Sequence, residues 1–152
     1  MSQNLKKESL SQEMQASSAT RANNYSGDVS QFDERVRRAL HAAAEKKALA
    51  PTVLDLRDIA TFTDFFVIVT GTNRRQVQAI SDEVVERLKR AGTRAARVEG
   101  YQTAEWILVD YGDFIVHVFD EKARRFYDLE RLWREAKRVD ITAEQLGSLR
   151  TE

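Results

Sequence analysis

The chain has 152 residues, with 24 basic and 24 acidic side chains and no cysteine, so its length suits one domain with extensions. The lack of cysteine excludes disulfides, thiol nucleophiles and thiolate metal sites, and the balanced charge creates no global field toward nucleic acid or membrane. Residues 1–20 contain no apolar signal-peptide core, and no run approaches the roughly 18 apolar residues of a membrane span. We therefore expect a cytoplasmic protein.

Composition divides the chain into three parts. Residues 1–30 are rich in Ser, Gln, Asn and Ala, which predicts a disordered N-terminal extension because such a segment has little to bury. Residues 31–138 form the expected domain, and residues 139–152 form a C-terminal tail. At the start of the domain, Phe32, Val36 and Leu40 recur at helical spacing, which predicts a helix over 31–48 with Ser30 as its capping residue.

The elements that follow alternate between strands and helices. Strands are predicted over 53–56, 65–70 and 94–98, and a helix begins after Thr72 or Asn73 and ends at Gly92. The 65–70 strand is apolar on both faces and so central, whereas two arginines place the 94–98 strand near an edge. Short helices are predicted over 121–126, capped by Asp120, and over 129–138. A further turn of helix is predicted to start at Thr142.

A β-hairpin is the clearest single feature of the sequence. Two β-branched and aromatic runs, 106–109 and 114–119, flank the turn 110–113, in which Gly112 can take a positive φ. Both runs are too apolar for a sheet with one wet face, so helices should cover the hairpin on both sides. The expected fold is therefore α+β, a mixed sheet of about five strands with helices packed on it.

The charge of this region changes sign along the chain. Residues 99–121 contain six acids and no Lys or Arg, whereas residues 122–138 contain seven bases and three acids. Trp106 begins the first run of the hairpin next to Glu105. We interpret Trp106 either as core packing or as the anchor of an interface, in which uncompensated acids around the ring would steer a basic protein partner.

The residues that could carry catalytic chemistry have structural explanations instead. The strand, Gly71, Thr72 and helix arrangement could hold a phosphate, but no Walker lysine follows and the 94–98 strand carries no acid. Asp110 and Asp113 are expected to bond the backbone of their turn, and His117 to be a hydrogen-bonded sheet residue. We predict no catalytic residue, no metal site and no cofactor.

Five segments in register resemble the ribosomal silencing factor family, RsfS or Iojap. The segments are TDFFVIVTGT (63–72), VEG (98–100), AEWILVDYGD (104–113), IVHVF (115–119) and RRFYDLERLW (124–133). The resemblance covers residues 33–134, and five matches in register are very specific.

The resemblance implies a fold related to nucleotidyltransferases without their catalytic carboxylates. It also implies binding to protein uL14 of the large ribosomal subunit, a steric block of subunit joining, repression of translation and, in some members, a free homodimer. By position, the uL14 surface would comprise Glu105, Trp106, Asp110, Tyr111, Asp113 and His117, with Tyr127 and Leu129 as weaker choices. Two alternatives stay open: a residual nucleotidyltransferase, and a self-associating module whose acidic face meets the basic 122–138 segment of a second copy.

Overall fold

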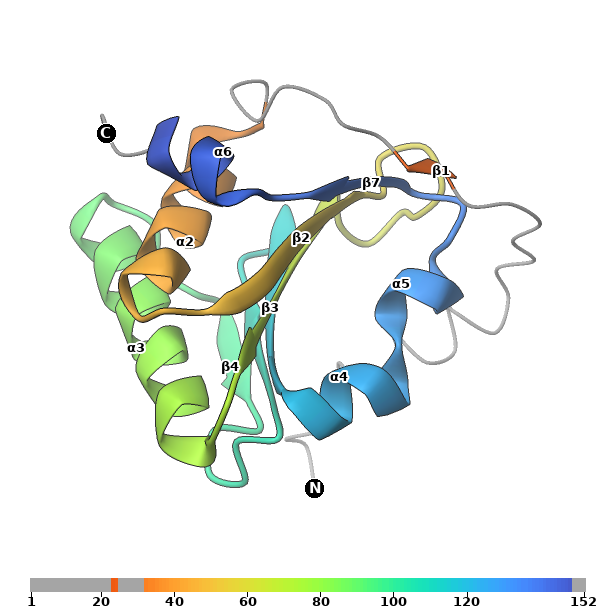
Figure 1. Ribbon diagram of the computed structural model, residues 1–152. Coiled ribbons are helices and arrows are strands. Elements are labelled where there is room, and N and C mark those ends of the chain that lie inside the picture. Colours follow the sequence, from red (N-terminus) through yellow and green to blue (C-terminus); the bar gives the residue numbers. More distant parts are fainter. Residues whose placement is uncertain (1–22, 25–31, 149–152) are drawn as a thin grey trace.

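The computed structural model describes residues 23–24 and 32–148, and a mixed seven-stranded sheet organises them. The strand order is β1-β7-β2-β3-β6-β5-β4. The helices α2 (Glu34–Glu45) and α3 (Arg74–Arg90) cover one face of the sheet, and α4 (Glu121–Tyr127) and α5 (Leu129–Leu132) cover the other (Figure 1). This arrangement confirms the predicted α+β class, with a larger sheet than expected.

Two parallel strands form the centre of the sheet. β3 (Phe65–Gly71) pairs with β6 (Phe114–Asp120), and every residue of β3 is buried. Such burial requires side chains that are apolar on both faces, as the sequence predicted. At the far edge, β4 (Arg97–Glu99) pairs only with β5 among the described strands, which confirms its edge position.

The predicted hairpin is confirmed. β5 (Trp106–Asp110) runs antiparallel to β6, with Trp106 opposite Phe119 and Asp110 opposite Ile115. The Tyr111 amide donates to the Phe114 carbonyl at 2.9 Å and closes the turn, where Gly112 has φ +83°. A residue with a side chain would be strained at that φ, so the glycine fixes the reversal.

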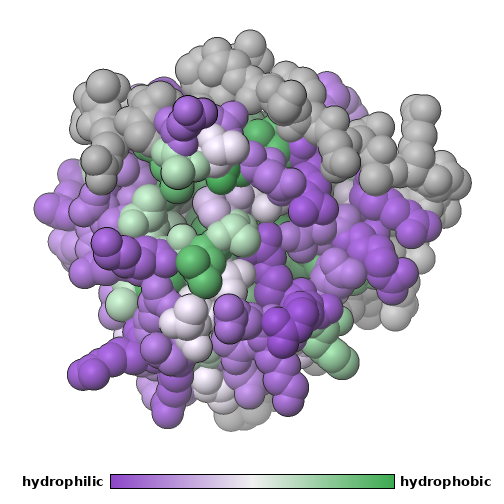
Figure 2. Space-filling view, viewed as in Figure 1, coloured by the Kyte–Doolittle hydropathy of each residue, from purple (hydrophilic) through white to green (hydrophobic). Residues whose placement is uncertain are grey.

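Two cores lie on opposite faces of the sheet. The larger core packs α2 and α3 against residues such as Val67, Val116 and Val118. The smaller core packs α4 and α5 against Phe66, Trp106 and neighbouring residues. Figure 2 shows apolar residues gathered in the middle of the same view, between hydrophilic surfaces over α3 and over α4.

The predicted helix over 129–138 is wrong. Helix α5 ends at Leu132, and residues Lys137–Asp140 form strand β7, which pairs antiparallel with β2 (Leu49–Asp55). Val139 lies opposite Val53 in this ladder and is buried. The side chains suit a helix, but a long-range pairing that local periodicity cannot reveal decides the outcome.

The ends of several elements differ from prediction. Asp33 caps α2 by accepting from the Arg35 amide at 2.8 Å, and Ser30 lies outside the described residues. Strand β2 begins earlier than expected, and Pro51 is tolerated because the register of the ladder shifts between Leu49 and Thr52. The predicted turn at Thr142 is confirmed as the start of α6 (Ala143–Ser148).

The outer parts of the chain are described only in part. Of the N-terminal extension, only β1 (Asn23–Asn24) is described, and its backbone pairs parallel with β7. The predicted disorder of the other residues up to 30 falls outside the described residues. The domain limits 31–138 and the tail 139–152 stay predictions, although β7 and α6 bring regular structure into that tail.

Candidate functional site: an aromatic corner beside the hairpin

Helix α4 begins where the hairpin ends, and its caps fix its position. The Asp120 carboxylate accepts from the Ala123 amide at 2.7 Å, and the Asp120 amide donates to the Glu105 carbonyl at 3.0 Å. Asp128 takes a left-handed conformation (φ +45°) and ends the helix after two turns. These contacts place the last side chains of α4 beside the first residues of the hairpin. We call this surface the α4 corner; it comprises Glu105, Asp120, Lys122, Ala123, Phe126 and Tyr127.

Aromatic rings run from the core to the surface of the α4 corner. Phe126 is 78% exposed and meets the edge of Tyr127, which is 42% exposed, with ring centroids 5.0 Å apart. Tyr127 covers Trp106 at 4.6 Å between centroids, and Trp106 packs on Phe119 at 5.0 Å. Leaving two aromatic rings in water is unfavourable. An exposed aromatic pair is therefore typical of a surface that a partner covers.

Trp106 belongs to the core of the free protein. Its side chain is 5% exposed, and its indole N–H donates to His117 Nδ1 at 3.0 Å. Because an indole N–H can only donate, Nδ1 must accept, which is the neutral imidazole with its proton on Nε2. His117 is fully buried, so it acts on the surface only by fixing the ring above it.

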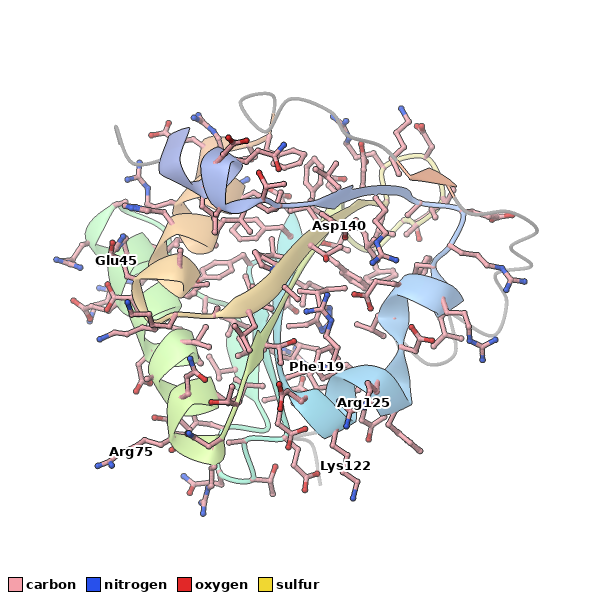
Figure 3. All side chains as sticks on the ribbon, in the orientation of Figure 1. Glu45, Arg75, Phe119, Lys122, Arg125 and Asp140 are labelled. Carbon is pink, nitrogen blue, oxygen red and sulfur yellow. The ribbon has the colours of Figure 1, made fainter. Side chains whose placement is uncertain are left out.

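Charged side chains border the aromatic rings. The residues of the α4 corner line a pocket of about 240 Å³, and they include the acids Glu105 and Asp120 and the base Lys122. Lys122 and Arg125 point outward from α4 in Figure 3, whereas Phe119 points toward the interior. The corner therefore offers both signs of charge around an apolar centre.

The structure divides the six predicted site residues into separate places. Glu105 lies at the α4 corner, and Trp106 and His117 lie beneath it in the sheet. Asp110, Tyr111 and Asp113 lie at the opposite end of β5, because this strand begins directly after Glu105 and ends at Asp110. A partner would have to span the length of β5 to contact both groups.

We call Asp110, Tyr111 and Asp113 the turn group; all three contact other residues of the chain. The Asp110 carboxylate accepts from the Gly112 amide at 2.8 Å, and Asp113 pairs with Arg35 at 2.8 Å. Tyr111 stacks on Phe114, and burial raises the pKa of Tyr111 to about 12. The expectation of uncompensated acids is thus wrong at Asp113, since its partner lies 78 residues away in the sequence.

One base of the basic 122–138 segment, Arg124, makes its contacts within the fold. Arg124 is 13% exposed and pairs with Glu130, and it donates to the Ala50 carbonyl at 2.8 Å and to Thr70 at 2.9 Å. Arg124 thereby ties α4 to the strands. This weakens the alternative in which the whole segment meets the acidic face of a second copy.

The start of α3 shows a structural use for the Gly71–Thr72 motif. A Cβ on Gly71 would lie 2.9 Å from Val77 Cγ2, so glycine permits close packing of β3 on α3. Asn73 accepts from the Gln76 amide at 2.8 Å, and the Gln76 side chain accepts from Thr72. Within residues 32–148, no group of His, Cys, Asp and Glu side chains could hold a metal ion, and no helix is long and apolar enough to cross a membrane.

Phe126 is the surface residue that sequence reasoning missed. Helix α4 has seven residues, too few for periodicity to show which of two adjacent aromatics faces the core. Tyr127 was a weaker choice and lies in the corner, whereas Leu129 is buried in the core. The signal that could have helped to place Phe126 is the pair of caps, Asp120 and Asp128, because they fix where helix α4 begins and ends.

An α+β domain that exposes an aromatic pair at one corner has a feature typical of proteins that bind another macromolecule. The comparisons with known proteins name the family. The family profile described as "RsfS: Ribosomal silencing factor during starvation" matches residues 29–151. The chain belongs to this family of ribosomal silencing factors.

Individual relatives agree with this assignment. The chain is 39% identical over 108 residues to the ribosomal silencing factor RsfS of Halalkalibacterium halodurans, covering 71% of this chain and 92% of that one. It is 38% identical over 103 residues to the RsfS of Bacillus subtilis, covering 68% and 87%. A crystal structure of a Chromobacterium violaceum protein superposes with a TM-score of 0.65 at 35% identity, covering 66% of this chain and 83% of that one.

Proposed function

We propose that the protein binds uL14 on the large ribosomal subunit, blocks joining of the small subunit by occupying its place, and so represses translation. Membership of the family supports a role in regulating translation. The observation that carries the docking proposal is the exposed pair Phe126 and Tyr127, held over Trp106 at the α4 corner.

The corner has the anatomy of an interface hot spot. Exposed aromatic rings supply area that a partner can bury, and the rigid core beneath them lowers the entropy lost on binding. Glu105 and Lys122, which line the same pocket, can set the register of the partner through complementary charges. Of the six predicted residues, Glu105 belongs to the α4 corner, and Trp106 and His117 support the exposed rings from below.

The turn group extends the proposed surface. Asp110, Tyr111 and Asp113 would contact uL14 only if the partner lies along the whole of β5, and Asp113 would then exchange or share Arg35. Buried Asp110 and Tyr111 would contribute through the shape of the turn. The model of action is steric, so it requires no reaction, no cofactor and no metal.

Binding to isolated uL14 tests this proposal directly. Purified uL14 carrying a fluorescent label should bind the parent protein, and substitution of Phe126 by Ala should weaken the affinity by about 30-fold, the equivalent of about 2 kcal/mol. Exposed Ile59, on the loop between β2 and β3, provides a matched control as Ile59→Ala. Equal weakening by both variants, or by neither, would reject the α4 corner as the docking site.

A further inference from the structure

The helix layer on the face opposite α4 carries a net positive charge. Residues 34–47, which include α2, contain five bases and two acids, and residues 74–90, which form α3, contain five bases and three acids. Because the whole chain is formally neutral, this excess of five positive charges is matched by an equal deficit elsewhere. The 99–121 segment, with six acids and no Lys or Arg, is the most acidic part of the rest of the chain.

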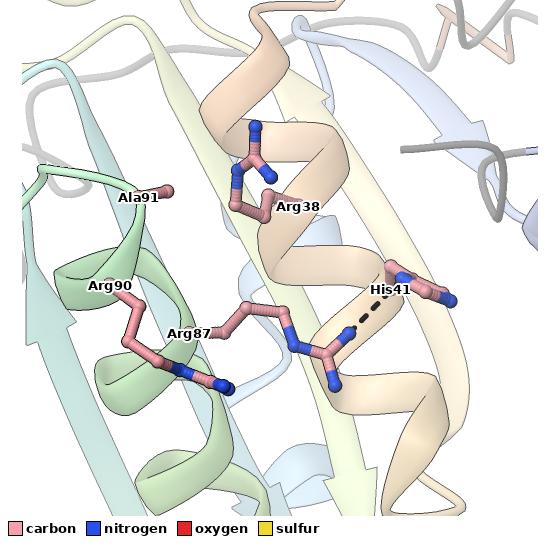
Figure 4. Close-up of a pocket in the computed structure, with 5 residues that line it drawn as sticks. All are labelled: Arg38, His41, Arg87, Arg90 and Ala91. Atoms are coloured by element: carbon pink, nitrogen blue, oxygen red, sulfur yellow. Dashed lines mark hydrogen bonds between the residues drawn. The ribbon is translucent and has the colours of Figure 1, made fainter.

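A basic hollow lies between these two helices. A pocket of about 440 Å³ is lined by Arg38 and His41 from α2 and by Arg87, Arg90 and Ala91 from α3 and its cap. Figure 4 shows Arg87 reaching across from α3 toward His41, where its guanidinium contacts Nδ1 at 3.1 Å. Three guanidinium groups from two elements thus surround one space.

Neighbouring acids hold these arginines in place without using all their donors. Arg38 donates to Glu34 at 2.6 Å, Arg87 donates to Glu83 at 2.6 Å, and Arg90 lies 3.7 Å from Glu86. Each guanidinium carries five N–H donors. The bonds described here therefore leave Arg38 and Arg90 with donors for an incoming anion.

The same face lacks what a protein partner would need. The exposed large apolar side chains among the described residues lie on strands, on loops and on α4, and α2 and α3 carry none. Hot spots of protein interfaces depend on such anchors, whereas nucleic-acid backbones are bound chiefly by Arg and Lys contacts to phosphate. A basic surface without an apolar anchor therefore favours a polyanion over a protein as the ligand.

We propose that the hollow between α2 and α3 is a phosphate-binding surface for the backbone of double-stranded RNA. Arg38, Arg87 and Arg90 would contact phosphates, and the other bases of the two helices would add attraction that is independent of sequence. The choice of RNA among polyanions rests on the proposed function, since a factor on the ribosome lies close to ribosomal RNA. Binding of the RNA backbone would then orient the protein while the α4 corner engages its protein partner.

Binding to a protein-free RNA hairpin of about 20 base pairs tests the inference separately from uL14. Fluorescence anisotropy at about 50 mM salt should show binding whose affinity falls linearly with salt on logarithmic axes. In the variant Arg38→Gln/Arg90→Gln, the loss of two phosphate contacts should weaken binding at least about fivefold and lower the salt slope by about two. This variant should bind isolated uL14 as the parent does.

The control removes the same charge from the opposite side of the molecule. Arg131→Gln/Arg134→Gln changes net charge equally and should bind the RNA hairpin as the parent does. The inference is overturned if the parent does not bind the hairpin, if the hollow variant binds equally well, or if the control loses as much. A parent that binds RNA but not uL14 would reject the proposed function and leave the phosphate surface standing.

Discussion

Replacing Trp106 by Ala distinguishes a core residue from an interface residue. A core residue predicts a large loss in the free energy of unfolding, whereas an interface residue predicts a loss of binding affinity. The ring is 5% exposed and contacts Tyr127, Phe119 and His117. A Trp buries about 150–250 Å², which at about 25 cal/mol per Å² corresponds to about 4–6 kcal/mol. Measured truncations of large buried side chains cost about 3–5 kcal/mol, so we expect a loss of that size in the free energy of unfolding.

A second substitution isolates the hydrogen bond. Trp106→Phe keeps an aromatic ring but removes the indole N–H that His117 Nδ1 accepts. Leaving that buried acceptor without its donor should cost about 1–3 kcal/mol. The expected order of stability is therefore parent, then Trp106→Phe, then Trp106→Ala.

Urea unfolding followed by circular dichroism measures these differences at neutral pH. The slope with urea should stay constant across the three proteins, because a change of slope would signal a change in the unfolded or native state rather than in the contact. A loss below about 1 kcal/mol for Trp106→Ala would refute the assignment of this ring to the core. Weak binding of uL14 by a variant that is still folded would then assign Trp106 to the interface alone.

Three further predictions concern other parts of the fold. Phe126→Ala should change the free energy of unfolding by less than about 0.5 kcal/mol, because the side chain is mostly in water, and a thermal melt that shows a larger loss would contradict its placement. Arg124→Met should lower the free energy of unfolding in urea by about 3–5 kcal/mol, because it leaves Glu130 buried without its partner. The double variant Arg124→Met/Glu130→Met should recover most of that loss. An equal loss in both variants would refute this pairing. Burial raises the pKa of Tyr111 to about 12, above its usual value near 10. Between pH 10 and 12 the phenol therefore ionises in the unfolded state but not in the native state, which favours unfolding. Over this range the parent should lose up to about 2.7 kcal/mol of stability relative to Tyr111→Phe. Parallel stability curves for the two proteins over that pH range would show that the phenol ionises as easily in the folded state.

Local features of the sequence were sufficient to predict an element where the side-chain pattern and the required backbone conformation point to the same structure. The hairpin is an example, because its β-branched runs and Gly112 specify strands and reversal together. The caps at Asn73 and Asp120 are others, since each side chain bonds an amide within three residues. In these places the determining contacts lie close together in the chain.

Contacts between distant segments could not be predicted in the same way. Residues 137–140 are a strand because β2 offers a free edge, and no pattern within 129–138 reveals that. The pairing of Asp113 with Arg35 joins residues that are far apart in sequence. The candidate site shows the same division: the sequence indicates that Trp106 is important, but its contact with Tyr127 joins residues from separate elements of the fold.

Subunit joining tests the central proposal most directly. Large ribosomal subunits are mixed with the protein, small subunits are added, and the products are separated on a sucrose gradient. We expect the parent to travel with the large subunit and to deplete the joined-ribosome peak, and Phe126→Ala to do neither at the same concentration. An undiminished joined peak with the parent protein at the top of the gradient would contradict the proposed silencing by steric block.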